Sequence, residues 1–158
     1  MAGKVIGISD MNTAKQTGSV ITYALGSCVG VALYDKTNRI AGLAHIMLPD
    51  SGEAKGVLNV MKYADTAVPA LVGLMVSEGA QRMFLIAKIA GGAQMFSMSG
   101  DRFRIGERNI AASKHALQKL KIPLVGEDTG CDYGRTVEIF AENGLYRIKA
   151  INKSTKEL

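Results

Sequence analysis

Two β-forming runs in the first third of the chain, separated by a short polar turn, restrict the fold more than any other part of the sequence. The runs are Val29–Tyr34 and Ile40–Leu48, and the turn-favouring residues Asp35-Lys36-Thr37-Asn38-Arg39 lie between them. Two such runs joined by so short a segment are typical of a β-hairpin. The sequence therefore predicts an antiparallel strand pair over residues 29–48.

Further strands and two helices are predicted around this hairpin. Short apolar runs predict strands at Val5–Ile8, Val20–Leu25, Met83–Ile89, Leu124–Glu127, Thr136–Phe140 and Leu145–Ile151. Helical spacing of apolar residues predicts one helix over Asn59–Glu78, disturbed at Pro69, and a second over Ile110–Leu120 with Asn109 as its N-cap. The polar segment Asp10–Thr17 is predicted as a loop. Strands in runs with helices set between them favour an α+β fold, a layered α/β sandwich of mostly antiparallel strands with two main helices.

Length and composition are consistent with one globular domain over residues 1–158. A chain of 158 residues, 47% of them hydrophobic, can bury a core without a disulfide or metal. The polar tail, residues 152–158, is expected to be frayed. Two distant cysteines do not form a disulfide framework, and no apolar run has the length of a membrane span or a signal peptide. We therefore expect a cytoplasmic protein that is not membrane-embedded.

The charged residues exclude some functional classes. The net charge of +5 favours an acidic partner, but the cations are scattered and no basic run contains interleaved aromatic residues. Nucleic acid is therefore not an expected partner. No Cys/His cluster has zinc-ligand spacing, so neither a metal nor another cofactor is expected.

Hairpin geometry places Cys28 and His45 on the same side of the strand pair. A tight turn at Thr37-Asn38 sets Val31 opposite Ala44, and side chains alternate along each strand. Cys28 and His45 are then diagonal neighbours on one face, roughly 7–8 Å apart between backbone positions, whereas a one-residue slip would separate them. A thiol attacks only as thiolate, which needs a base or a positive group nearby. The pattern therefore predicts a cysteine nucleophile with a histidine base.

Neighbouring residues provide the other parts of this candidate site. Gly26 allows close approach of a substrate, and the Ser27 hydroxyl and the Cys28 backbone N–H are candidate oxyanion donors. Thr22, on the preceding predicted strand, is a candidate for orienting the imidazole. The second histidine, His115, falls on the polar face of its predicted helix.

A purely structural interpretation competes with this one. A free cysteine commonly packs as a small hydrophobic residue, and a single histidine in a strand is more often a satisfied core group than a base. The pairing on one face beside a Gly-Ser turn is what favours chemistry.

Six motifs follow one another along the chain. They are Leu25-Gly26-Ser27-Cys28-Val29, His45-Ile46-Met47-Leu48-Pro49, Lys62-Tyr63-Ala64-Asp65, Ala87-Lys88-Ile89-Ala90-Gly91-Gly92-Ala93-Gln94-Met95, Ile105-Gly106-Glu107-Arg108-Asn109, and Gly130 followed by Gly134-Arg135. In this order and spacing the chain resembles, over nearly its whole length, the CheD family of bacterial chemotaxis proteins, the chemoreceptor glutamine deamidases.

The resemblance implies a function and a set of roles. Members of the family hydrolyse the side-chain amide of selected receptor glutamines to glutamate and ammonia. Cys28 corresponds to the nucleophile, His45 to the base and Thr22 to the residue that orients it. The resemblance also implies an α/β sandwich, chemoreceptors (methyl-accepting chemotaxis proteins) as protein substrates, and a CheC-type phosphatase as a regulatory partner.

Other positions keep two interpretations. The pair Gly91-Gly92 favours a tight turn, and by resemblance these glycines, with Met95 and Phe96, are candidates for a substrate or partner surface. The family commonly has two adjacent glycines where this chain has Gly130-Cys131. A non-enzymatic chemotaxis regulator that acts by binding CheC, and a thiol redox protein, are the competing functions.

Overall fold

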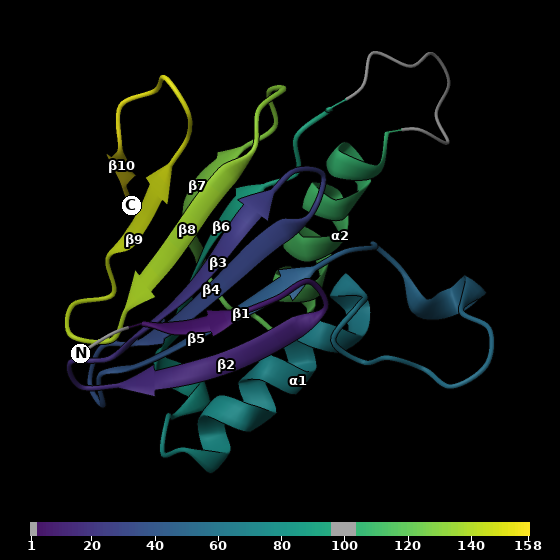
Figure 1. The fold of residues 1–158 in the computed structure, drawn as a ribbon. Coiled ribbons are helices and arrows are strands. Elements are labelled where there is room, and N and C mark those ends of the chain that lie inside the picture. Colours follow the sequence, from purple (N-terminus) through teal and green to yellow (C-terminus); the bar gives the residue numbers. More distant parts are fainter. Residues whose placement is uncertain (1–2, 96–103) are drawn as a thin grey trace.

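The structure is a computed structural model that describes residues 3–95 and 104–158. Its strands form two five-stranded sheets, drawn in Figure 1. The first, here called the outer sheet, has the order β1 (Lys4–Ile6), β3 (Ser19–Leu25), β8 (Arg135–Phe140), β9 (Tyr146–Lys149) and β10 (Lys156–Glu157). The second, the central sheet, has the order β2 (Asp10–Lys15), β5 (Ile40–Ile46), β4 (Val29–Asp35), β6 (Leu85–Gly91) and β7 (Leu124–Thr129).

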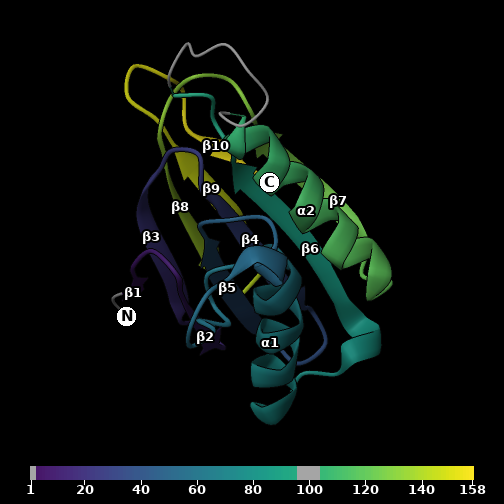
Figure 2. The same ribbon diagram turned by 90° about the vertical axis from the view of Figure 1, so that its right-hand side faces the viewer.

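Two helices cover one face of the central sheet. They are α1 (Ala64–Ser77) and α2 (Ile105–Lys119), and short 3₁₀ turns occupy Ser51–Glu53 and Arg82–Phe84. Figure 2 shows both helices on the side of β4 and β6 that faces away from the outer sheet. The order of layers is therefore helices, central sheet, outer sheet. The fold is α+β, as predicted, and among the named strands of the described residues only β1–β3 and β6–β7 pair in parallel.

Burial follows this layer order. Every residue of β4 and β5 is buried, because layers cover both faces of the central sheet. On β8, buried and half-buried residues alternate, as expected for a sheet with one face toward solvent. Alternation also divides the core: Val31 and Leu33 pack on the helix side, whereas Ala32 and Leu43 pack in the core between the two sheets.

The predicted hairpin and its register are confirmed. Val31 pairs with Ala44 and Asp35 with Ile40. At the next position toward the loop end, Gly30 pairs with His45, and a Cβ on Gly30 would lie 2.6 Å from the Tyr146 hydroxyl of the outer sheet. The missing side chain lets the two sheets approach closely beside His45.

Three expectations are wrong in detail. Residues 10–17 are not all loop, since Asp10–Lys15 form β2 along the edge of β5; its polar side chains hid a strand whose pairing supplies the stability. The tail is not frayed, because β10 pairs with β9. The first helix begins at Ala64 rather than Asn59 and continues through Pro69.

The second helix begins earlier than expected, at Ile105, so Asn109 is not an N-cap but a buried residue inside α2.

No helix in the described part of the chain is long and apolar enough to span a membrane.

Candidate active site

Cys28 ends the short loop of residues 26–28 that joins β3 to β4, at the upper end of the sheets in Figure 1. The side chain is half-buried and packs against the core between the sheets. Each of the three carbonyl oxygens of this loop accepts a hydrogen bond from outside it. The donors are the Ala93 N–H to Gly26 (2.9 Å), the Asn109 side-chain amide to Ser27 (2.9 Å) and the Gly92 N–H to Cys28 (2.8 Å). The loop is therefore fixed from two other elements.

The glycine pair Gly91-Gly92, at the end of β6, packs directly against this loop. Gly91 has φ +107°, and a Cβ there would lie 2.3 Å from the Cys28 carbonyl oxygen. Gly92 has φ +67°, and a Cβ there would lie 2.3 Å from Ile110 of α2. Both glycines are buried. Both glycines have the positive φ that tight turns use, and the loop of residues 26–28 and α2 pack against them; their place on a substrate or partner surface stays a prediction.

His45 lies in β5 and is 1% exposed. By strand alternation its side chain points, like Leu43, into the space between the sheets, where Thr22 of the outer sheet meets it. Thr22 is fully buried, and its Oγ1 lies 2.7 Å from His45 Nδ1. The structure therefore brings together two of the three predicted residues across the sheet–sheet junction.

The hydrogen bonds fix the tautomer of this imidazole. The Thr22 hydroxyl donates its only proton to the Ile6 carbonyl oxygen at 3.0 Å, because a carbonyl can only accept. The same oxygen must then accept from His45, so Nδ1 carries the proton and Nε2 has a free lone pair. In the described residues, Nε2 is buried and has no hydrogen-bond partner. This nitrogen is available to take a proton.

Burial favours the neutral form of both Cys28 and His45. Burial lowers the pKa of His45 to about 4, although the charge of Asp10, which pairs with it on β2, acts in the opposite direction. Burial raises the pKa of the Cys28 thiol. At neutral pH the resting pair is therefore a thiol and an imidazole, not a thiolate and an imidazolium.

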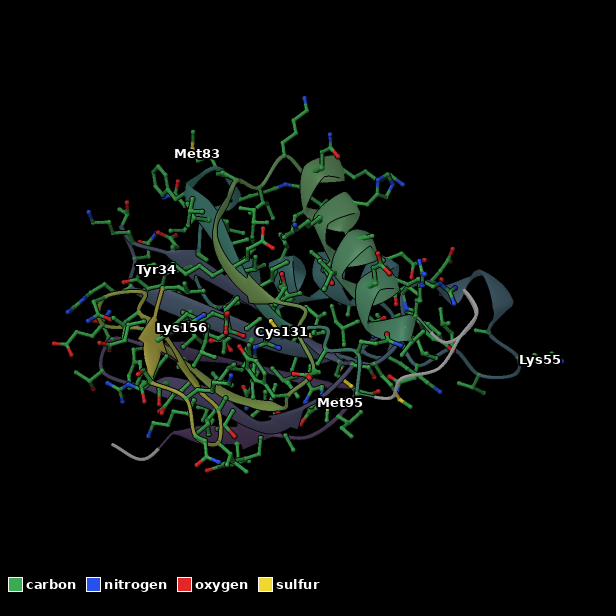
Figure 3. All side chains as sticks on the ribbon, turned by 90° about the horizontal axis from the view of Figure 1, so that it is seen from above. Tyr34, Lys55, Met83, Met95, Cys131 and Lys156 are labelled. Carbon is green, nitrogen blue, oxygen red and sulfur yellow. The ribbon has the colours of Figure 1, made fainter. Side chains whose placement is uncertain are left out.

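The remaining predicted residues differ in their accessibility. Gly26 and Ser27 are half-buried in the loop. Met95 is 44% exposed, and its Cγ lies 3.3 Å from where a Cβ on Gly26 would be. Figure 3 looks onto the end of the molecule where Met95 and Cys131 lie. Phe96 lies outside the described residues.

Two further residues bear on this end of the molecule. Cys131 is exposed and has φ +60°, next to Gly130 at φ +82°, so both residues adopt the left-handed backbone conformation that favours glycine. Sequence reasoning assigned Asn109 a different role, as a helix cap. Its spacing with Ser113, Ala116 and Leu117, all buried on one helix face, was the signal for a buried position.

A metal has no evident place here. Among residues 3–95 and 104–158, no group of three or more His, Cys, Asp or Glu side chains could hold a metal ion. The chemistry available at this end of the molecule is that of a thiol, an imidazole with one free nitrogen, and backbone N–H groups.

Comparison with a solved structure concerns the fold alone. The crystal structure of Bacillus licheniformis hypothetical protein YfiH superimposes with a TM-score of 0.52 at 12% sequence identity, covering 77% of this chain and 51% of that one. This chain thus corresponds to about half of that protein, and the two share an arrangement of elements.

Comparison of sequences is more specific. The family model described as "CheD chemotactic sensory transduction" matches residues 47–150. Relatives named probable chemoreceptor glutamine deamidase CheD include those of Lachnoclostridium phytofermentans (46% identity, covering 97% of this chain and 96% of the relative) and Moorella thermoacetica (50%, covering 96% and 92%). A third, from Caldanaerobacter subterraneus, is 47% identical over 96% of this chain and 94% of its own. At this similarity over nearly the full length, the chain belongs to the CheD family.

Proposed function

We propose that this protein is a chemoreceptor glutamine deamidase in which Cys28 is the nucleophile, His45 the general base and Thr22 the residue that orients it. The names of its relatives support the reaction and the substrate class. The observation that carries the assignment of residues is the hydrogen-bonded series from His45 Nδ1 through Thr22 to the Ile6 carbonyl. It leaves Nε2 unprotonated, and both the His45 side chain and Cys28 lie on the side of the central sheet that faces the outer sheet.

The first half of the reaction forms a thioester. The Cys28 thiol gives its proton to His45 Nε2, and the sulfur attacks the glutamine side-chain carbonyl carbon. The tetrahedral intermediate carries its negative charge on the former carbonyl oxygen, where backbone N–H groups of residues 26–28 and the Ser27 hydroxyl are the nearby donors. The imidazolium then protonates the nitrogen, the C–N bond breaks and ammonia leaves.

The second half returns the enzyme to its starting state. A water molecule gives a proton to Nε2 and attacks the thioester carbon, and the C–S bond breaks as the sulfur regains the proton. The products are a glutamate side chain on the receptor and free enzyme. Each turnover replaces a neutral amide by a carboxylate, so the receptor gains one negative charge per modified site.

We further propose that the reaction takes place in the cytoplasm and that a CheC-type phosphatase regulates it. The support is the family resemblance, together with the position of Met95. Its exposed side chain packs against Gly26, two residues before Cys28. A partner bound over Met95 would compete with a receptor for the surface beside the loop of residues 26–28. Binding of CheC to wild type and to Met95→Glu, measured by calorimetry, tests this: unchanged affinity would place the partner elsewhere.

The deamidase proposal is tested with purified chemoreceptor fragments. Wild-type protein is expected to release ammonia and to raise the receptor mass by about one unit per converted glutamine, as amide-to-acid chemistry requires. Cys28→Ala is expected to abolish both signals, whereas Cys131→Ser, which removes the exposed free cysteine, should leave them unchanged. Ammonia release by Cys28→Ala would refute the nucleophile. Absence of release from wild type, with normal CheC binding, would favour the non-enzymatic regulator.

A further inference from the structure

Asn109 links the two catalytic segments from a third element. It lies on α2, fully buried, and its side-chain amide donates to the Ser27 carbonyl at 2.9 Å and to the Met47 carbonyl at 3.0 Å. Ser27 immediately precedes the nucleophile, and Met47 lies just beyond the end of β5, which carries His45. One NH₂ group therefore holds the nucleophile loop and the end of the base's strand together.

The bond to Ser27 also sets the direction of the next N–H group. A peptide unit is planar and trans, so the carbonyl of Ser27 and the N–H of Cys28 point in opposite directions. Because Asn109 holds this carbonyl toward α2, the Cys28 N–H points away from the helix. In the described residues no acceptor is found for it. Within the described part of the chain it is thus an oriented donor without an acceptor, on the proposed nucleophile itself.

The position of Asn109 is itself tightly fixed. One turn earlier on α2, a Cβ on Gly106 would lie 2.4 Å from the Ala93 carbonyl oxygen, so the helix packs directly on the segment that bonds to the loop. Among the described residues the buried Asn109 Oδ1 atom has no hydrogen-bond partner, which is unfavourable for folding. A leucine of similar size would fill the position without burying an unsatisfied oxygen. The two hydrogen bonds donated by the side-chain NH₂ group are therefore the reason for an asparagine here.

Resting on the deamidase function proposed above, we infer that Asn109 is a positioning residue that aims the Cys28 backbone N–H at the oxyanion of the tetrahedral intermediate. It touches neither substrate nor reacting atoms. Its effect is exerted through the peptide unit between residues 27 and 28, and it should matter in the transition state more than in substrate binding.

The experiment compares two reactions of the same sulfur in a Cys131→Ser background. Ammonia release from a receptor fragment needs an oxyanion donor, whereas alkylation of Cys28 by iodoacetamide does not. For Asn109→Leu we expect kcat to fall by about 10²-fold, the size of effect seen when one oxyanion donor is lost, with KM and the alkylation rate near wild type. His45→Gln should lower both reactions.

A matched control lies one turn further along the same face. Ser113 is fully buried on α2, and its hydroxyl has no partner in the described residues, so Ser113→Ala tests the helix packing without removing a bond. It should leave both reactions unchanged. Circular dichroism checks folding, and if Asn109→Leu does not fold, Asn109→Ala, which adds no atoms, takes its place.

The failures can be told apart. A wild-type kcat in the folded variant would overturn the role of Asn109 and leave the deamidase proposal intact. Parallel loss of kcat and of alkylation would show that Asn109 only keeps the loop folded. No ammonia release from the wild type would refute the deamidase function itself, and this role with it.

Discussion

His45 is oriented by a hydroxyl group and not by a carboxylate. The Thr22 oxygen accepts a hydrogen bond from Nδ1 and its hydroxyl donates one to the Ile6 carbonyl, so the imidazole is held in one tautomer by a neutral partner. The closest charge that influences its pKa is that of Asp10 on the neighbouring strand. An imidazolium formed during reaction therefore lies in a buried site that disfavours it, which promotes rapid return of the proton to the leaving group.

Thr22→Val tests this arrangement with a side chain of the same shape. The variant removes the acceptor for Nδ1, so the imidazole loses its fixed tautomer, and we expect kcat for ammonia release to fall by about 10²-fold, within the range of a lost general base. It also leaves two buried groups unsatisfied, which should lower the free energy of unfolding by about 1–3 kcal/mol in urea titrations. Thr22→Ser keeps the hydroxyl and should retain most activity. Full kcat in Thr22→Val would argue against the orienting role.

Burial of His45 also makes the stability depend on pH. The folded-state pKa of about 4 lies below the ordinary value of 6.5, so the unfolded chain binds this proton first as the pH falls. The stabilisation is complete above pH 6.5 and is lost between pH 6.5 and 4, by an amount on the order of 3 kcal/mol. The measurement is the free energy of unfolding of wild type and of His45→Gln at each pH. The contributions of the other titrating groups cancel in the difference between the two proteins. A difference independent of pH across this window would mean that His45 titrates normally.

At the scale of elements, the loop of residues 26–28 takes its conformation from the segment of residues 91–93 that packs against it. The segment after β6 supplies two N–H donors to the loop, and it can approach so closely only because Gly91 has no side chain. Together with α2, this segment supports the loop from the side opposite the proposed oxyanion position.

Gly91→Ala should therefore disturb both stability and catalysis. The new methyl group would meet the Cys28 carbonyl oxygen at 2.3 Å, and φ of +107° is unfavourable for alanine. We expect a loss of about 1–3 kcal/mol in unfolding free energy and a lower kcat, because the loop must shift. Gly73→Ala is the matched control: this exposed glycine of α1 has open space around it, and alanine there should raise stability by roughly 0.5–1 kcal/mol. Equal effects of the two changes would contradict this account.

Elements with a strong local pattern were predictable, and those that depend on distant partners were not. The hairpin register followed from one polar turn, and the structure confirms it from Val29–Ile46 to Asp35–Ile40. The strand β2 is polar in sequence and is recognised only by its pairing with β5. Asn109 resembled a cap because asparagine is common at helix starts, and its two acceptors come from loops 62 and 82 residues away in the sequence.

At the scale of the whole molecule, the candidate site exists only where the layers meet. The outer sheet provides Thr22, the central sheet provides His45 and the start of β4, and the helical layer provides Asn109. Local sequence patterns place each residue within its own layer. They do not fix how the layers stack, which is why Thr22 could be named as a candidate but not positioned before the structure was known.

The tail shows how much this layering depends on distant segments. Leu158 exchanges two backbone hydrogen bonds with Tyr146, of 2.9 and 3.0 Å, and its carbonyl oxygen accepts from Lys88 of the central sheet at 2.7 Å. Burial lowers the pKa of Lys88, and the Gly144 carbonyl is its other acceptor. The tail therefore fastens the outer sheet to the central sheet.

Deletion of residues 156–158 should accordingly destabilise the whole fold and not only its end. It removes both backbone bonds to Tyr146 and leaves the Lys88 ammonium with fewer partners, so we expect a loss of roughly 1–3 kcal/mol in urea unfolding, as one cooperative transition. Lys156→Ala removes only the ion pair of an exposed lysine with Asp128, which keeps its bond to Arg135, and should change stability little. In the described residues the hydrogen bonds of the tail go to β9, Lys88 and Asp128 and not to residues 26–28, so kcat of the remaining folded protein should be unchanged. A deletion as stable as Lys156→Ala would show that the two sheets hold together without the tail.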